Sequence, residues 1–199
     1  SHADDQWTLV DRGANGGVAG DDVRVIDTST KTVSVRGLAG HQVDQLPIGT
    51  VGAVTDTQRG KVICIMHQYA LMGEGKTIHA SAQWEHFGSD VNEKSRRIPG
   101  GTQCVTTLDG YAIPLSVKNG LPYMKMRPYT DSEWDSLPHV VVTSDTEWDP
   151  SVIDFDLTND EEWFDAVSND SQLKLNNGLF DKYGDFNRTS NLDNHTWHF

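Results

Sequence analysis

Long apolar runs and cysteine clusters are missing from this sequence. No stretch of the 199 residues approaches the roughly 20 consecutive apolar residues that span a bilayer. The two cysteines, Cys64 and Cys104, each lie in an apolar, strand-like run, so a disulfide framework is excluded. The first residues have neither the basic nor the apolar part of a secretory leader. We therefore expect a cytoplasmic protein that does not bind membranes.

Lysine and arginine are absent from residues 131–170, although this stretch holds 13 Asp and Glu residues. The whole chain has 29 acidic and 16 basic residues, so its net charge of -13 comes from this one stretch. The stretch would repel a polyanion, and we expect no nucleic-acid partner there. Its acids alternate with aromatic residues in a short repeat, Glu133-Trp134-Asp135 and Glu147-Trp148-Asp149. Both a solvated tail and an acidic-aromatic docking segment fit this pattern.

Short apolar runs separated by glycine and polar turns occupy residues 7–69, without a helical period. They predict strands at residues 7–10, 23–26, 32–36, 49–55 and 61–69. The run 62–66 is continuously apolar, which predicts a strand buried on both faces. Residues 57–60 are typical of a hairpin turn. The spacing of apolar residues then predicts a helix over 76–87, with Gly88 as its C-cap.

The second half of the chain has weaker signals. Asp109-Gly110 between two apolar runs, 104–108 and 111–117, predicts a hairpin. Helices are predicted at 130–136 and 158–168, with Thr130 and Thr158 as N-caps. The last thirty residues, rich in Asn and Asp, are typical of poorly structured chain.

The most informative segment is an apolar strand that leads a carboxylate into a tight turn, followed by small residues that keep the backbone close. It reads Trp7-Thr8-Leu9-Val10-Asp11-Arg12-Gly13-Ala14-Asn15. This is the layout of an aspartic peptidase half-site. The segment resembles the retropepsin-like proteases, and more closely the protease segment of copia-type retrotransposon polyproteins, in which Asp-Ser/Thr-Gly-Ala follows a tryptophan.

The resemblance extends over about residues 7–127 as an ordered series of weak motifs. Residues 33–35 followed by Gly40-His41 look like the flap hairpin of the family, and 49–51 look like its returning strand. Residues 61–70 are similar to its apolar strand, and 77–84 to its closing helix. Residues 108–123 are similar to the stretch that joins protease to integrase. The implied fold is a mainly β, retropepsin-like half-barrel.

The resemblance implies an aspartic endopeptidase that cleaves a polyprotein and needs no cofactor or metal. Its chemistry needs two carboxylates that share one proton, one to activate water and one to hydrogen-bond the scissile carbonyl. This chain has one such motif, so a homodimer with Asp11 from each protomer is implied. The implied substrate-binding residues are Gly13, Ala14, Asn15, Gly40 and His41.

Arg12 departs from the family, which has Ser or Thr after the catalytic Asp. A guanidinium has no acceptor and cannot replace a hydroxyl that hydrogen-bonds across a dimer. Near Asp11 it would also favour the ionised carboxylate. Turned outward to a carboxylate such as Asp21 or Asp22, Arg12 would leave the dyad intact, and the sequence leaves both positions open. The alternative is a catalytically inactive retropepsin fold that binds or assembles.

A third interpretation is a phosphate-binding loop. Residues 70–77 fit a relaxed form of that motif, after an apolar strand and before the predicted helix. The 60 residues before the loop show no helix, however, whereas such a domain alternates strands and helices. No Cys or His cluster has zinc spacing.

The predicted domain organisation has three parts. A retropepsin-like domain covers residues 5–90, a β-hairpin connecting segment covers 91–127, and an acidic, partly disordered extension with short helices covers 128–199.

Overall fold

The computed structural model describes residues 6–154, 165 and 168–169. The chain divides into two compact units, Ser1–Ile153 and Asp154–Phe199. Every labelled strand and helix lies in the first unit. The predicted helix at 158–168 lies almost entirely outside the described residues.

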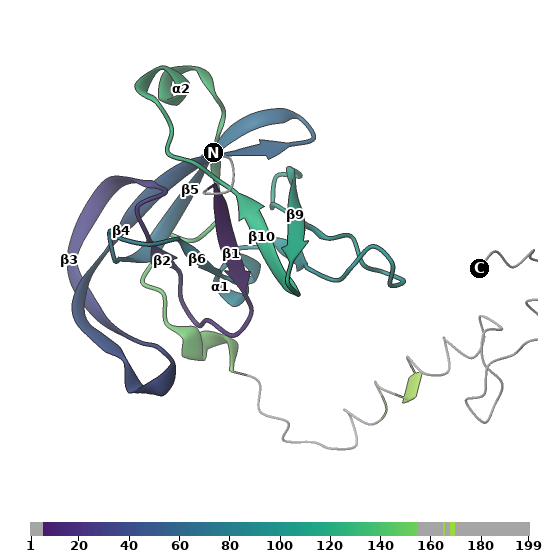
Figure 1. Cartoon of the computed structure of the whole chain (residues 1–199), viewed down its shortest axis with the longest axis horizontal. Coiled ribbons are helices and arrows are strands. Elements are labelled where there is room, and N and C mark those ends of the chain that lie inside the picture. The colour runs from purple at the N-terminus through teal and green to yellow at the C-terminus, as the bar shows by residue number, and fades with distance from the viewer. Residues whose placement is uncertain (1–5, 155–164, 166–167, 170–199) are drawn as a thin grey trace, which may run out of the picture. The chain divides into compact units, whose positions relative to one another are not determined.

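The first unit is mainly β, a mixed sheet curled into a half-barrel with two short α-helices (Figure 1). This much of the predicted fold class is confirmed. The strand order in the sheet is β3-β4-β5-β2-β6-β1-β10-β9-β8-β7, and β11 also pairs with β5. The elements are β1 (Trp7–Asp11), β2 (Val18–Ala19), β3 (Arg24–Arg36), η2 (Leu38–Gly40), β4 (Gln42–Thr57), β5 (Gly60–Leu71), β6 (Ile78–Ala80), α1 (Ser81–His86), β7 (Asp90–Asn92), β8 (Cys104–Thr106), β9 (Ala112–Lys118), β10 (Leu121–Lys125), α2 (Asp131–Ser136), β11 (His139–Val141) and η3 (Pro150–Ile153).

Strand β5 forms the centre of the core. Residues 62–66 are all buried, which confirms the expectation from their continuous apolar run. β5 also has neighbours along both edges, since β4 pairs with one edge while β2 and β11 pair in parallel with the other. Cys64 is fully buried, and burial raises the pKa of its thiol to about 12, so this cysteine acts as a core residue.

Strands β3 and β4 form one long hairpin that extends from the body of the sheet (Figure 1). We predicted two strands at 23–26 and 32–36, but the polar residues between them continue a single strand. Residues 27–31 are exposed, so no apolar alternation is required of them, and backbone pairing with β4 holds the strand together through register shifts. The hairpin ends at Gly40 and His41, where His41 O accepts a hydrogen bond from Gly37 N at 2.7 Å. The turn uses left-handed backbone at Ala39 and Gly40.

The predicted helix over 76–87 is wrong in its first half. Residues Ile78–Ala80 form β6, which pairs in parallel with β1, and only Ser81–His86 are helical. Backbone pairing with β1 competes with helix formation at these residues and prevails. The helix ends as predicted at Gly88, whose φ of 110° allows a Schellman motif with hydrogen bonds from Gly88 N to Glu85 O and from Ser89 N to Trp84 O.

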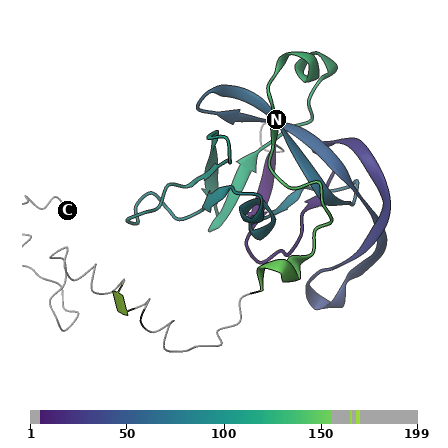
Figure 2. The ribbon, with the colours of Figure 1, turned by 180° about the vertical axis from the view of Figure 1, so that it is seen from behind.

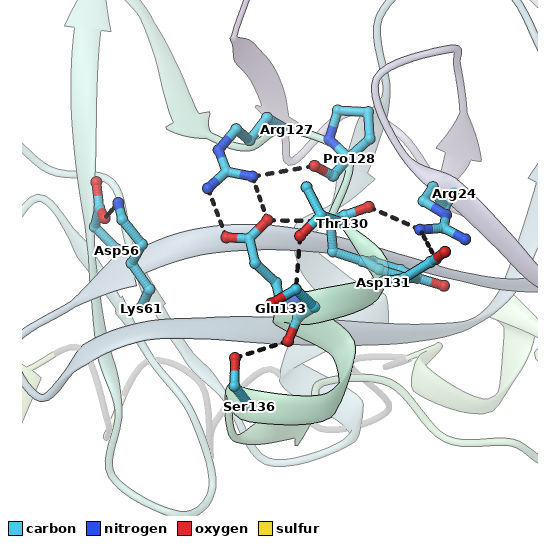
Figure 3. Close-up of polar contacts among 11 residues, drawn as sticks. Arg24, Asp56, Lys61, Arg127, Pro128, Thr130, Asp131, Glu133 and Ser136 are labelled. Atoms are coloured by element: carbon cyan, nitrogen blue, oxygen red, sulfur yellow. Dashed lines mark hydrogen bonds and ion pairs between the residues drawn. The ribbon is translucent and has the colours of Figure 1, made fainter.

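The turn at Asp109-Gly110 joins β8 to β9 as predicted, and α2 confirms the helix at 130–136. Thr130 caps α2 in a capping box with Glu133, and Arg127 makes a bidentate ion pair with the same Glu133 (Figure 3). Residues 128–153, which we assigned to the extension, contribute α2, β11 and η3 to the first unit.

Candidate functional site

Asp11 is the last residue of β1 and stands on a tight turn. Its backbone pairs with Ala80 of β6, and its carbonyl accepts a hydrogen bond from Ala14 N at 3.2 Å. The carboxylate accepts a hydrogen bond from Gly13 N at 2.8 Å, which fixes its orientation, and its side chain is half-buried. A Cβ at Gly13 would lie 3.1 Å from this carboxylate, so glycine gives the carboxylate its room.

Arg12 is held at α1 and β7 instead of at Asp11. Its guanidinium donates to Glu85 at 2.7 Å and to Glu93 at 2.8 Å, and its third partner is Val91 O. The two carboxylates raise the pKa of Arg12, and Arg12 in turn lowers the pKa of Glu93. Of the two positions left open for Arg12, the structure shows the outward one, with Glu85 and Glu93 as its partners in place of Asp21 or Asp22.

Asp22 has a different role from the one we expected. It is buried and accepts hydrogen bonds from the backbone and hydroxyl of Thr77. The Thr77 hydroxyl also accepts one from Gly20 N at 3.0 Å, and Thr77 leads into β6. This arrangement argues against the phosphate-loop interpretation, because the loop leads into a strand before the helix and its Thr hydroxyl is engaged in the core.

A buried chain of hydrogen bonds supports the strands that carry Asp11. Trp84 Nε1 donates to the Tyr69 hydroxyl at 2.8 Å, and that hydroxyl lies 2.7 Å from His79 Nδ1. His79 Nε2 lies 2.9 Å from the Thr8 hydroxyl, which donates to Met124 O. Only a neutral His79 protonated at Nε2 lets each group donate in turn. Burial accordingly lowers the pKa of His79 to about 3.

The turn after Asp11 returns to the sheet through Gly16 and Gly17. A Cβ at Gly17 would lie 2.5 Å from the Tyr69 ring, so the backbone packs directly on that ring. Gly17 N donates to the side chain of Gln83 on α1, and Gly17 O accepts from Ala70 N. Helix α1 and strand β5 therefore fix the turn from both sides.

A groove of about 440 Å³ opens between this turn and the β3–β4 hairpin. Its walls come from the turn, from β3, from β4 and β5, and from the segment after β11. Most of the side chains that line it are apolar, and Arg36 is its charged member. The lining residues are Asn15, Gly16, Gly17, Val18, Val33, Ser34, Val35, Arg36, Ile48, Gln68, Ala70, Trp148 and Pro150.

Of the site residues predicted from sequence, Asn15 lines this groove. Asp11, Gly13 and Ala14 belong to the same turn as Asn15 but do not line the groove, and Gly40 and His41, at the end of the hairpin, do not line it either. Sequence reasoning missed Gln68, Trp148 and Pro150. The aromatic residue inside an acidic stretch was a signal for Trp148, but nothing in the sequence placed it beside Asn15.

Gln68 is a strained position at the floor of the groove. Its φ is 60°, and the register of β4 and β5 shifts here, so that β5 has a bulge. The Gln68 backbone carbonyl accepts a hydrogen bond from the side chain of Gln83 at 3.0 Å. Non-glycine residues in this conformation concentrate at functional sites, because the surrounding structure must hold them there.

Two further sequence expectations concern metals and membranes. Among residues 6–154 and the few described beyond them, no group of three or more His, Cys, Asp or Glu side chains could hold a metal ion. In the same part of the chain, no helix is long and apolar enough to cross a bilayer.

Comparisons with known proteins found no match. No family model matches the chain, and neither a curated protein nor a solved structure is similar to it at a significant level. The resemblance to retropepsin-like proteases therefore depends on the sequence motifs given above.

Proposed function

We propose that this chain is an aspartic endopeptidase of a retroelement polyprotein and acts as a homodimer. One observation carries the proposal. Asp11 ends a strand of the curled sheet, on a glycine-containing turn whose amide orients the carboxylate, and the later residues of the same turn, from Asn15 on, line a groove bordered by a long hairpin. An aspartic peptidase needs an oriented carboxylate to activate water and a groove to hold the peptide.

Catalysis would use Asp11 of both protomers at the two-fold axis. Two carboxylates about 3 Å apart share a proton, because both cannot ionise at that distance. The ionised one takes a proton from water as the water attacks the scissile carbonyl, and the protonated one donates a hydrogen bond to the carbonyl oxygen. The Gly13 amide supports this role, since it aims one oxygen of Asp11 and leaves the other free to face its symmetry mate.

The β3–β4 hairpin would cover the bound peptide. β3 stands at the edge of the sheet order, and an extended peptide could add to the sheet through its main chain. Val33, Val35 and Ile48 line the groove and favour apolar substrate side chains. Gly40 and His41, at the end of the hairpin, would close over the peptide and exclude water.

The position of Arg12 is compatible with this chemistry. Its guanidinium makes its ion pairs with Glu85 and Glu93 instead of with Asp11. It still leaves the dimer without the hydroxyl that braces the two turns in the family. That observation favours a second function, a binding or assembly module on the same fold without catalysis.

Cleavage of a denatured protein at about pH 5, where a carboxylate dyad is singly protonated, tests the proposal. We expect the full chain to cleave, pepstatin to inhibit it, and Asp11→Asn to abolish it. Asp21→Asn, an exposed carboxylate ten residues further along the chain, is the matched control and should retain activity. Dimers without Asp11-dependent cleavage would favour the binding module, and a monomer at high concentration would overturn the dimeric enzyme.

A further inference from the structure

The segment that follows β11 is delivered to the groove by its pairing with β5. β11 runs parallel to β5, and Val142 N continues this ladder to Ile65 O at 3.1 Å. Thr143 then makes two hydrogen bonds to the backbone of His67. The Thr143 hydroxyl donates to His67 O and accepts from His67 N, both at 2.7 Å. The next residues reach the bulge at Gln68. We call residues 144–150 the strap.

The strap contacts the floor and the turn side of the groove. The Gln68 amide donates to Asp145 O at 3.3 Å, and Gln68 Oε1 accepts from Trp148 N at 3.4 Å. The Trp148 indole donates to Asn15 O at 2.7 Å and would lie 3.6 Å from a Cβ at Gly16. Its ring also lies 5.5 Å from His86 of α1. Trp148 thus makes an aromatic anchor on the turn that carries Asp11.

The strap also contacts the hairpin. Lys31 of β3 pairs with Glu147 at 2.7 Å, and Pro150 lines the groove together with Val33 and Val35. Figures 1 and 2 show from opposite sides that the chain leading into η3 passes beside the β3–β4 hairpin. The Lys31–Glu147 pair is exposed, so it orients the strap more than it strengthens binding.

These contacts are the kind a groove makes with a bound peptide. They use two main-chain groups of the strap, one aromatic side chain, one acidic side chain and one proline. They also span the space between the turn and the hairpin, where the proposed function places substrate. A covering that only completed the core would bury its anchor fully, whereas Trp148 stays half-buried and Asp145, Thr146 and Glu147 are exposed.

We propose that the strap, which forms part of the wall of the groove through Trp148 and Pro150, narrows the groove in cis as an autoinhibitory segment, and that without the strap the groove binds peptides in which an aromatic residue is flanked by acidic ones. This deepens the proposed function, because it assigns the same groove a substrate class and a means of regulation. A peptide binds in trans only in the fraction of molecules whose strap has left, so wild type shows a weakened apparent affinity.

The test measures fluorescence anisotropy of a labelled peptide of residues 143–154 with the full-length chain. We expect Trp148→Ala to bind it about tenfold more tightly than wild type, the change that follows if the strap holds its position against the turn and the hairpin in nine molecules of ten. Trp134→Ala removes the tryptophan of the other acidic repeat, on α2, and should bind like wild type. A labelled peptide with Ala in place of Trp should bind neither protein.

Glu147→Lys provides a second variant that removes no packed side chain. It sets two cations against each other at Lys31, and it should tighten peptide binding in the same direction if Trp148→Ala fails to fold. Equal peptide affinity of wild type and a folded strap variant would overturn the proposal, as would tighter binding of the Trp134→Ala protein.

The failure of this proposal can be told from the failure of the proposed function. Peptide binding is measured in an Asp11→Asn background, so it needs no catalysis. If the strap variants bind the peptide more tightly but the chain with its native Asp11 cleaves nothing, the strap proposal stands and the peptidase proposal is wrong. Asp11-dependent cleavage at the same rate with and without Trp148 would retain the peptidase and reject the strap.

Discussion

The Tyr69 hydroxyl lies 2.7 Å from Nδ1 of His79, in a chain of hydrogen bonds that admits no second proton on the imidazole. Tyr69 donates to Nδ1, because among the described contacts this nitrogen is the acceptor that the hydroxyl hydrogen meets, while Trp84 Nε1 can only donate to the oxygen. Protonating Nδ1 would leave two donors facing each other in a buried site. Neutral His79 is therefore a condition of the fold that supports β1 and Asp11.

The first prediction is a loss of stability in mild acid. The ordinary pKa of His79 is 6.5, and burial lowers it to about 3 in the folded chain. Between these values the unfolded chain binds one proton more than the folded chain, so the free energy of unfolding falls as pH falls below 6.5. At about pH 5 the loss from His79 alone is about 2 kcal/mol relative to neutral pH. Urea unfolding at the two pH values measures it.

The control for this prediction is the exposed His41 at the end of the hairpin. His79→Gln should flatten the pH dependence between about pH 5 and 7.5, because glutamine can bridge Tyr69 and Thr8 without titrating. His41→Gln should leave the dependence unchanged. An unaltered slope in the His79 variant would show that another group causes it.

Local patterns predicted the turns and the buried central strand because each depends on a few adjacent residues. Asp109-Gly110, the capping residue Thr130 and the apolar run 62–66 are of this kind. The helix predicted over 76–87 failed because the parallel partner of Ile78–Ala80 is β1, about 70 residues earlier in the chain. A local period carries no information about such a partner.

A second prediction compares two adjacent glycines of the turn. Gly17→Ala would place a Cβ 2.5 Å from the Tyr69 ring, and we expect it to destabilise the fold by about 1–3 kcal/mol through overpacking. Gly16→Ala is the matched control, since the nearest atoms to its Cβ would be in van der Waals contact at 3.6 Å. Thermal unfolding of both variants measures the difference. Equal stability of the two would show that Tyr69 can move away.

The candidate site could be predicted only where its residues are close in sequence. Asp11, Gly13 and Asn15 form one turn, and the motif places them together. Gln68 and Trp148 reach the groove through pairing of β5 with β11, a contact between segments about 80 residues apart that no motif encodes. The partners of Arg12 were missed for the same reason, because Glu85 and Glu93 approach it only through α1 and β7.

A third prediction concerns the element that precedes the strap. Thr130→Ala removes one half of the capping box of α2 and should cost about 1 kcal/mol of stability. Ser132→Ala, an exposed position in the same helix, should cost little, because alanine is the better helix former. Arg127 lowers the pKa of Glu133 to about 2, so the other half of the box should persist at mildly acid pH. Equal losses from both variants, measured by urea unfolding, would show that the cap contributes nothing.

The last prediction asks whether Arg12 limits the activity of the proposed enzyme. Arg12→Ser removes half-exposed ion pairs to Glu85 and Glu93, which should cost about 1 kcal/mol of stability or less. It supplies the hydroxyl that can donate and accept across a dimer, and two such hydrogen bonds are worth enough to raise the cleavage rate about tenfold. Sedimentation should show more dimer, and peptide cleavage should show faster turnover. The double variant Asp11→Asn/Arg12→Ser should keep the additional dimer but lose the turnover. Arg97→Ser, in an exposed loop, is the control for a lost positive charge. If Arg12→Ser forms more dimer but cleaves no faster, the binding module is the better description, because restoring the hydroxyl contact between protomers would then not have restored catalysis.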